Sequence, residues 1–160
     1  MKIIAHRGNT SGPSQYENSP ESINFALSLG FDVEIDVWSI NESVYFGHDG
    51  PEYLVDKIAI LDIGHDGWFH CKNLEAIDMF IETFPNLNYF WHQNDDFTLT
   101  SDGLIWTYPG KKIGSNSIIV LPEKIDEDIL DEMLANKPYA ICTDWPIKYE
   151  RRRWNQFYSF

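Results

Sequence analysis

Short apolar runs alternate with helix-like segments along most of the chain. The run at 2–5 precedes Ser19-Pro20-Glu21, which combines an N-cap serine, a proline at the first helical position and an acid in the first turn. Apolar residues then recur at helical spacing until Gly30, where we expect the helix to end. Strand and helix in this order predict a parallel β/α architecture. Further strands are expected at 32–37, 68–71, 88–91, 104–107, 117–121 and 139–142, with a helix that is closed by Pro85 and another that begins near Asp126.

Crossover helices are missing from this pattern in two places. The segments 91–104 and 107–117 are too short for a strong crossover helix and its turns. A full barrel of eight β/α units takes about 250 residues and rarely fewer than 200, whereas this chain has 160. A barrel built from this sequence would therefore be a reduced one.

The segment VEIDVW, 33–38, places two carboxylates inside an otherwise apolar strand. Side chains alternate along a strand, so Glu34 and Asp36 share one face. An isolated Glu-x-Asp pair more often belongs to an edge strand with one wet face. Here the strand follows a helix in a β/α series, so both faces should be covered, and two unpaired carboxylates would repel each other and resist desolvation. A divalent cation resolves both problems, and we predict that Glu34 and Asp36 bind one.

Other polar residues follow predicted strands at the carboxyl ends, where parallel β/α domains gather their functional groups. His6 and Arg7 follow the first strand, His48 follows an aromatic run, and Lys72 follows the third strand. A single histidine in such a place is usually structural, but two beside two carboxylates could supply the acid and the base of phosphodiester cleavage. Arg7 and Lys72 add positive charge suited to a phosphate.

Composition narrows the partners and the compartment. The chain has 12 basic and 25 acidic residues and a formal net charge of -13, which disfavours sequence-independent binding to nucleic acid. We expect no signal peptide and no integral membrane association, since only three consecutive apolar residues precede the first His-Arg pair. Cys71 and Cys142 fall in apolar runs, and we expect free buried thiols and a cytoplasmic location.

The polar motifs form one ordered set over the first 49 residues. His6-Arg7-Gly8 is followed by ENSPES at 17–22, EIDV at 34–37 and His48-Asp49. In order and spacing this set resembles the signature of glycerophosphodiester phosphodiesterases, which belong to the phosphatidylinositol-phospholipase-C-like superfamily. A weaker match, ICTDWP at 141–146, resembles the final-strand motif of that family, so the resemblance extends from start to end of the chain.

The resemblance implies a TIM-type barrel, and the predicted fold class is α/β: a single domain over 1–160, a reduced TIM-type (β/α) barrel with several crossover helices shortened or missing. It also implies a divalent metal at Glu34 and Asp36, catalytic roles for His6 and His48, and a phosphate contact from Arg7. A glycerol hydroxyl would attack phosphorus while one histidine takes its proton and the other protonates the leaving alcohol. Water would then open the resulting cyclic phosphate.

Two residues of the ENSPES motif are implied to support the site. Glu17 and Asn18 match the Glu-Asn element of the family, which shapes the floor of the site and forms hydrogen bonds there.

One position departs from the family pattern. The family usually places a third carboxylate ligand two residues before a lysine, whereas this chain has His70-Cys71-Lys72. A bound His70 would make the donor set two oxygens and one nitrogen, which shifts preference from Mg²⁺ or Ca²⁺ towards Mn²⁺, Zn²⁺ or iron. Without His70 the metal would be weakly held. We favour His70 as a ligand, and Lys72 keeps its place as a phosphate contact.

Three functions remain open from these patterns. The leading hypothesis is a metal-dependent phosphodiesterase of lipid metabolism that hydrolyses small glycerophosphodiesters to glycerol phosphate and an alcohol. A lyase that cleaves phospholipid headgroups, like the phospholipase-D-like relatives, would keep the same fold. A degenerate barrel that only binds phosphate compounds is the third. The patterns do not determine the leaving alcohol, the metal or the oligomeric state.

Aromatic and basic residues outside the motifs have two interpretations each. Trp38, Trp91, Trp106 and Trp145 could surround the mouth of the site and stack on a sugar or a choline-like headgroup, although core packing is more common. The basic run 151–153 is expected to lie on a C-terminal helix.

Overall fold

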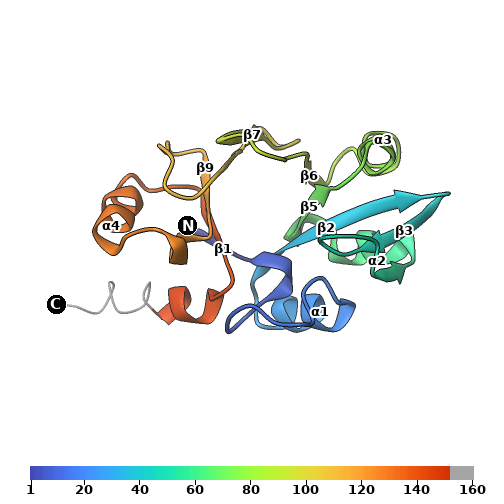
Figure 1. Cartoon of the computed structure of the whole chain (residues 1–160), viewed down its shortest axis with the longest axis horizontal. Helices are drawn as coiled ribbons and strands as arrows, with labels where there is room; N and C mark the ends of the chain where they lie inside the picture. The colour runs from blue at the N-terminus through green and yellow to red at the C-terminus, as the bar shows by residue number, and fades with distance from the viewer. Residues whose placement is uncertain (152–160) are drawn as a thin grey trace.

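The computed structural model describes residues 1–151, which wrap around a strongly curled sheet (Figure 1). Of the basic run expected on a C-terminal helix, Arg151 is helical, and Arg152 and Arg153 lie outside the described residues. Within 1–151, no helix has both the length and the apolar character needed to cross a membrane.

Parallel strands form most of the sheet, as the strand-helix pattern predicts. Each strand in the following order pairs in parallel with the next: β6 (Asn88–Phe90), β5 (Gly67–Cys71), β2 (Asp32–Ile40), β1 (Lys2–Ala5), β10 (Ala140–Thr143), β9 (Ser117–Val120) and β8 (Ile105–Thr107). An antiparallel strand, β7 (Phe97–Leu99), pairs with the outer side of β8. At its far end β2 leaves the barrel-like part and pairs with an antiparallel arm of β3 (Ser43–Phe46) and β4 (Tyr53–Val55).

The β7 segment bridges the gap between β6 and β8. The Ser101 amide donates to the Tyr89 carbonyl at 2.9 Å, and the Ser101 hydroxyl donates to the Leu87 carbonyl at 2.8 Å. The Thr98 hydroxyl donates to the Trp91 carbonyl at 2.7 Å. Side-chain and single backbone hydrogen bonds thus replace a regular strand ladder here. The result is an α/β fold with a curled sheet, consistent with a reduced TIM-like barrel.

Three of the four helices lie where the sequence predicts them, and α2 is additional. The structure contains α1 (Pro20–Ser28), α2 (Lys57–Ile63), α3 (Leu74–Thr83) and α4 (Glu127–Ala135). Ser19 caps α1 by accepting a hydrogen bond from the Ser22 amide, and Asp126 caps α4 in the same way. The two short connections predicted to lack helices contain none between 91 and 117.

Alternation along the strands divides the apolar residues between two sides of the sheet. Val33, Ile35 and Val37 of β2 are fully buried and pack in the larger core that includes α1 and α3. The opposite face of β2 carries Glu34 and Asp36, which are also buried. The carboxylates therefore point to the inside of the curl, away from the helices.

The inside of the curl has a smaller apolar core beneath these carboxylates. It contains Ile4, Trp68, Phe90, Trp106 and Cys142. Cys142 and Cys71 are both buried and free, as the apolar runs around them predict.

Candidate functional site

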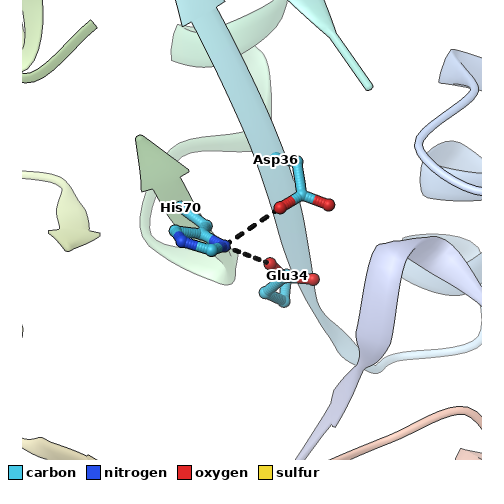
Figure 2. A group of neighbouring side chains, drawn as sticks. All are labelled: Glu34, Asp36 and His70. Carbon is cyan, nitrogen blue, oxygen red and sulfur yellow. Dashed lines mark ion pairs between the residues drawn. The ribbon is translucent and has the colours of Figure 1, made fainter. Parts of the chain in front are cut away.

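Two neighbouring strands bring together three side chains that could bind a metal ion. Glu34 and Asp36 project from β2, and His70 of β5 pairs in register with Asp36. Figure 2 shows one nitrogen of the His70 ring facing both carboxylates. Its Nδ1 lies 3.0 Å from Asp36 Oδ1 and 3.7 Å from Glu34 Oε1, and one ligand atom of each residue lies within 4.8 Å of the others. Position 70 thus stands where the family pattern would place its third acid.

The chemistry of this group fits a divalent cation. Asp36 Oδ1 is buried and forms no hydrogen bond among the described residues. His70 Nε2 is 2.9 Å from the His92 carbonyl, so this nitrogen carries the proton and neutral His70 presents the lone pair of Nδ1 to the carboxylates. Two atoms bound to one ion at about 2.1 Å lie roughly 3 to 3.5 Å apart, close to the observed spacing. We refer to Glu34, Asp36 and His70 as the metal-ligand group.

The second oxygen of Asp36 organises the opposite side of the site. Asp36 Oδ2 accepts from Asn18 Nδ2 at 3.0 Å and lies 3.1 Å from His48 Nδ1 and 3.3 Å from Arg7 Nε. Burial raises the pKa of Asp36, but the hydrogen bond with His48 and the neighbouring His70 and Lys72 outweigh it, so the pKa lies well below its usual value.

Glu34 responds in the opposite direction. Complete burial, together with the neighbouring charge of Asp36, raises the pKa of Glu34 despite nearby His6, His70 and Arg7. The Arg7 amide donates to Glu34 Oε2 at 3.1 Å. A divalent ion beside both carboxylates would favour the ionised form of each.

His6 is oriented by a carboxylate that comes from the far end of the chain. His6 Nδ1 lies 2.7 Å from Asp144 Oδ1, and Nε2 remains open to the cavity, 3.9 Å from Glu34 Oε2. Burial lowers the pKa of His6, but the hydrogen bond with Asp144 and the charge of Glu34 outweigh it, so the pKa is raised. Burial likewise opposes ionisation of Asp144, yet its bond with His6 lowers the pKa.

The loop that carries Asp144 is itself held by a carboxylate. Glu123 accepts hydrogen bonds from the Thr143 hydroxyl and the Asp144 amide, both at 2.8 Å. Asn9 Nδ2 donates to Asp144 Oδ1 at 2.8 Å and also contacts Glu17 Oε1 at 2.9 Å. The sequence interpretation assigned no role to Asn9, Glu123 or Asp144, although Asp144 belongs to the ICTDWP motif that could have indicated it.

His48 is held between Asp36 and Arg7. Its Nδ1 faces Asp36, so Nε2 accepts from Arg7 Nη2 at 3.0 Å. Arg7 has left-handed backbone angles, with φ 53°, and its Nη1 donates to Glu17 Oε2 at 2.8 Å. Lys72 Nζ lies 3.2 Å from Asp36 Oδ1 and 3.4 Å from His48 Nδ1. With His70, four cationic or imidazole groups therefore surround the Asp36 carboxylate.

These side chains line one side of a cavity of about 620 Å³. The predicted residues that face it are His6, Arg7, Glu34, Asp36, His48, His70 and Lys72. Glu17 and Asn18 lie behind this surface, where they hold Arg7 and Asp36.

The tryptophans divide between the two interpretations. Trp38, Trp91 and Trp106 line the cavity, whereas Trp145 does not. Trp145 packs against Gly12, where an added Cβ would lie 2.7 Å from the indole ring.

Comparisons with known proteins agree with the motifs at the level of the fold. No protein-family model matches the chain, and no curated protein matches its sequence significantly. The crystal structure of a glycerophosphodiester phosphodiesterase from Parabacteroides distasonis matches with a TM-score of 0.54 and 12% identity, over 98% of both chains. The chain therefore shares the fold of a glycerophosphodiester phosphodiesterase over nearly its whole length, which supports the family resemblance that its motifs carry.

Proposed function

We propose that this chain is a metal-dependent phosphodiesterase that hydrolyses glycerophosphodiesters to glycerol phosphate and an alcohol. One observation carries the proposal: His6 and His48, each oriented by a carboxylate, face the same cavity as the metal-ligand group. Arg7 and Lys72 add positive charge beside them. This combination suits a phosphodiester anion and two proton transfers. A cytoplasmic location and a role in lipid metabolism stay predictions.

Glu34, Asp36 and His70 would hold one divalent ion, either Mg²⁺, Ca²⁺, Mn²⁺ or Zn²⁺. When bound, the ion would neutralise charge on the phosphate and polarise its phosphorus–oxygen bonds. The nitrogen donor of His70 favours Mn²⁺ or Zn²⁺ over the harder cations.

His6 is the better placed base of the two histidines. Because Asp144 accepts from Nδ1, neutral His6 leaves Nε2 unprotonated towards the cavity. Nε2 would take the proton of the glycerol hydroxyl as its oxygen attacks phosphorus. Protonated His48 would give its proton to the departing alcohol oxygen. The roles then reverse: His48 takes a proton from water, and His6 returns one to the oxygen of the opening cyclic phosphate.

Arg7 would bind the phosphate and at the same time release His48. In the structure, Arg7 Nη2 donates a hydrogen bond to His48 Nε2 at 3.0 Å. A phosphate oxygen is the stronger acceptor for a guanidinium, so binding of the diester would draw this group away. His48 Nε2 would then be free to carry the proton for the leaving alcohol.

Turnover by the reconstituted full-length protein tests the proposal. With Mg²⁺, Mn²⁺, Ca²⁺, Zn²⁺ and Co²⁺ in separate reactions, we expect release of glycerol phosphate from glycerophosphodiesters. Removal of a general acid or base typically costs about 10²- to 10⁴-fold, so His6→Ala and His48→Ala should lose that much kcat at unchanged metal content. His65→Ala, in the turn before β5, is the matched control. Absence of turnover with every metal would refute the proposal, and a cyclic product that is never hydrolysed would favour the lyase.

Metal affinity tests the ligand role of position 70. For His70→Ala, the metal concentration that gives half of the maximal rise in melting temperature should increase at least tenfold. His70→Glu should keep binding and shift the preference towards Mg²⁺ or Ca²⁺, because the donor set becomes all oxygen. The His65→Ala protein should bind as the wild type does. Unchanged affinity in both variants at position 70 would place that residue outside the metal shell.

A further inference from the structure

The cavity has a second side that the proposed chemistry does not use. It is formed by Trp106 of β8 and by residues that follow β6, β8 and β9. We define the aromatic wall as Trp91, Gln93, Trp106, Tyr108, Leu121 and Lys124. A phosphodiester carries an alcohol on each side of its phosphorus. With the phosphate held beside the metal-ligand group, one of these alcohols lies against the aromatic wall.

The aromatic wall combines one packed ring, that of Trp106, with two exposed rings, those of Trp91 and Tyr108. Trp106 stacks on Phe90 with ring centroids 4.4 Å apart, and Phe90 stacks on His70 at 4.9 Å. Trp91 is 37% exposed and Tyr108 is 51% exposed, although both line the cavity. Large exposed rings at a cavity offer broad apolar faces with a hydrogen-bonding edge.

Two hydrogen bonds hold the backbone that carries the exposed rings. The Trp91 carbonyl accepts from the Thr98 hydroxyl at 2.7 Å. The Tyr108 amide donates to the Asp96 carbonyl at 3.0 Å. The Tyr108 ring also stacks on His92, with ring centroids 6.1 Å apart. A wall whose backbone is held in this way lowers the entropic cost of placing a ligand against it.

The charges of the aromatic wall are unsuited to a cationic alcohol. Lys124 is its charged member, and the carboxylates among the described lining residues, Glu34, Asp36 and Asp49, belong to β2 and to the segment that follows β3. Glu123, the sequence neighbour of Lys124, accepts hydrogen bonds from residues 143 and 144 with both oxygens. A quaternary ammonium at this wall would meet aromatic faces, but it would also meet the positive charge of Lys124.

The polar groups of the wall suit hydroxyls instead. Trp91 and Tyr108 carry an indole N–H and a phenol, Gln93 carries an amide, and Lys124 carries three N–H donors, and all four residues line the cavity. A cyclic polyol offers the complement, with C–H faces for the rings and hydroxyls for these donors and acceptors.

We propose that the aromatic wall selects, among phosphodiesters, those whose alcohol is an uncharged hydroxylated ring such as inositol or a sugar, over those with a quaternary ammonium. This inference rests on the proposed function, because it assumes that the phosphate sits beside the metal-ligand group. Tyr108 and Lys124 are then specificity-determining residues: Tyr108 stacks on the ring, and Lys124 both donates to its hydroxyls and repels a cation.

Equilibrium binding tests this selectivity without turnover. Calorimetric titrations use the full-length, Mn²⁺-loaded His48→Ala protein, with His6→Ala as a second inactive background, and compare glycerophosphoinositol with glycerophosphocholine. We expect at least tenfold tighter binding of the inositol diester. In the same background Tyr108→Ala should remove most of that difference, and Lys124→Met should strengthen choline binding at least threefold. Tyr16→Ala and Lys112→Met, which replace exposed residues outside this cavity, should leave both affinities unchanged.

The two proposals can fail separately. Equal affinity, or tighter binding of the choline diester, overturns the selectivity even if both compounds are hydrolysed. Tighter binding of the inositol diester without hydrolysis by wild-type protein with any metal overturns the proposed function and supports the wall as a binding surface. If Tyr108→Ala and Lys124→Met change affinity no more than their controls, the wall does not contact the alcohol, and the inference is wrong.

Discussion

The contact between His6 and Asp144 can be weakened without changing its shape. Asp144→Asn replaces a charged acceptor by a neutral one of nearly equal size. Asn9 Nδ2 donates to the same Oδ1 at 2.8 Å, so the amide oxygen rather than the amide nitrogen of the new side chain should face His6. The His6 tautomer that leaves Nε2 free is therefore kept, and the change removes charge alone.

The expected magnitude follows from this single substitution. A hydrogen bond to a charged partner contributes about 1.5–3 kcal/mol, whereas a neutral one contributes about 0.5–1.5 kcal/mol. The difference, roughly 1–1.5 kcal/mol, corresponds to about a tenfold lower kcat if the contact stabilises the imidazolium that forms in the transition state. KM should change little, because Asp144 does not line the cavity.

The pH dependence has a definite sign. The bond with Asp144 and the charge of Glu34 outweigh burial and hold the pKa of His6 above its usual value. Loss of the Asp144 charge lowers that pKa, so the acidic limb of kcat/KM, which reports neutral His6, should move to lower pH.

Steady-state kinetics from pH 5 to 9 with equal metal loading would measure both effects. Asp96→Asn, which removes a surface carboxylate paired with Lys111, is the matched control. An Asp144→Asn protein with wild-type kcat and an unshifted acidic limb would show that His6 does not depend on this carboxylate.

Three further predictions concern the scaffold. Gly47→Ala should lower the free energy of unfolding by about 1–3 kcal/mol and lower kcat, because Gly47 has φ 148° and an added Cβ collides with the Gly50 carbonyl beside His48. Gly50→Ala is the control, since its added Cβ meets no atom, and equal melting temperatures of the two variants would contradict the prediction. Asp32→Ala leaves the buried indole N–H of Trp68 without its acceptor and should lower the free energy of unfolding by about 1–3 kcal/mol, or the melting temperature by roughly 3–10 °C. Lys2→Met removes only the partly exposed ion pair with Asp32 and should cost under about 1 kcal/mol; equal losses would show that the bond from Trp68 is not the one that stabilises the fold. Burial raises the pKa of the Cys71 and Cys142 thiols, so a chromogenic disulfide reagent at pH 8 should label them only after the protein unfolds. Fast labelling of the native protein would contradict their burial.

Local signals predict most of the fold because they act over a few residues. The Ser19-Pro20 start of α1 and the alternation within β2 are of this kind, and both agree with the structure. The helix α2 and the strand β7 were not predicted. Apolar residues lie on both faces of α2, since Ile60 is buried while Ile58 and Leu61 are exposed, so their spacing marks no single buried face. The strand β7 has only three residues, with its two apolar residues exposed, too few for a period to be read.

Site residues divide in the same way. The motif residues Glu34 and Asp36 could be placed on one inward face from alternation alone. The pairing of His70 with Asp36 needs the register of two strands, and the contact of His6 with Asp144 joins residues 138 positions apart. Such long-range contacts depend on how the sheet curls, which no local pattern in one sequence specifies.

Asp36 serves two sets of partners at once. Oδ1 faces His70 and Lys72, and Oδ2 faces His48 and Arg7. A cation at Oδ1 withdraws electron density from the whole carboxylate, and a phosphate that draws Arg7 away removes a donor from Oδ2. Cation and diester then change each other's affinity by the same factor, as thermodynamic linkage requires. Metal affinities measured on the protein alone therefore differ from those of the protein–diester complex, and it is the latter that determine which metal is bound during turnover.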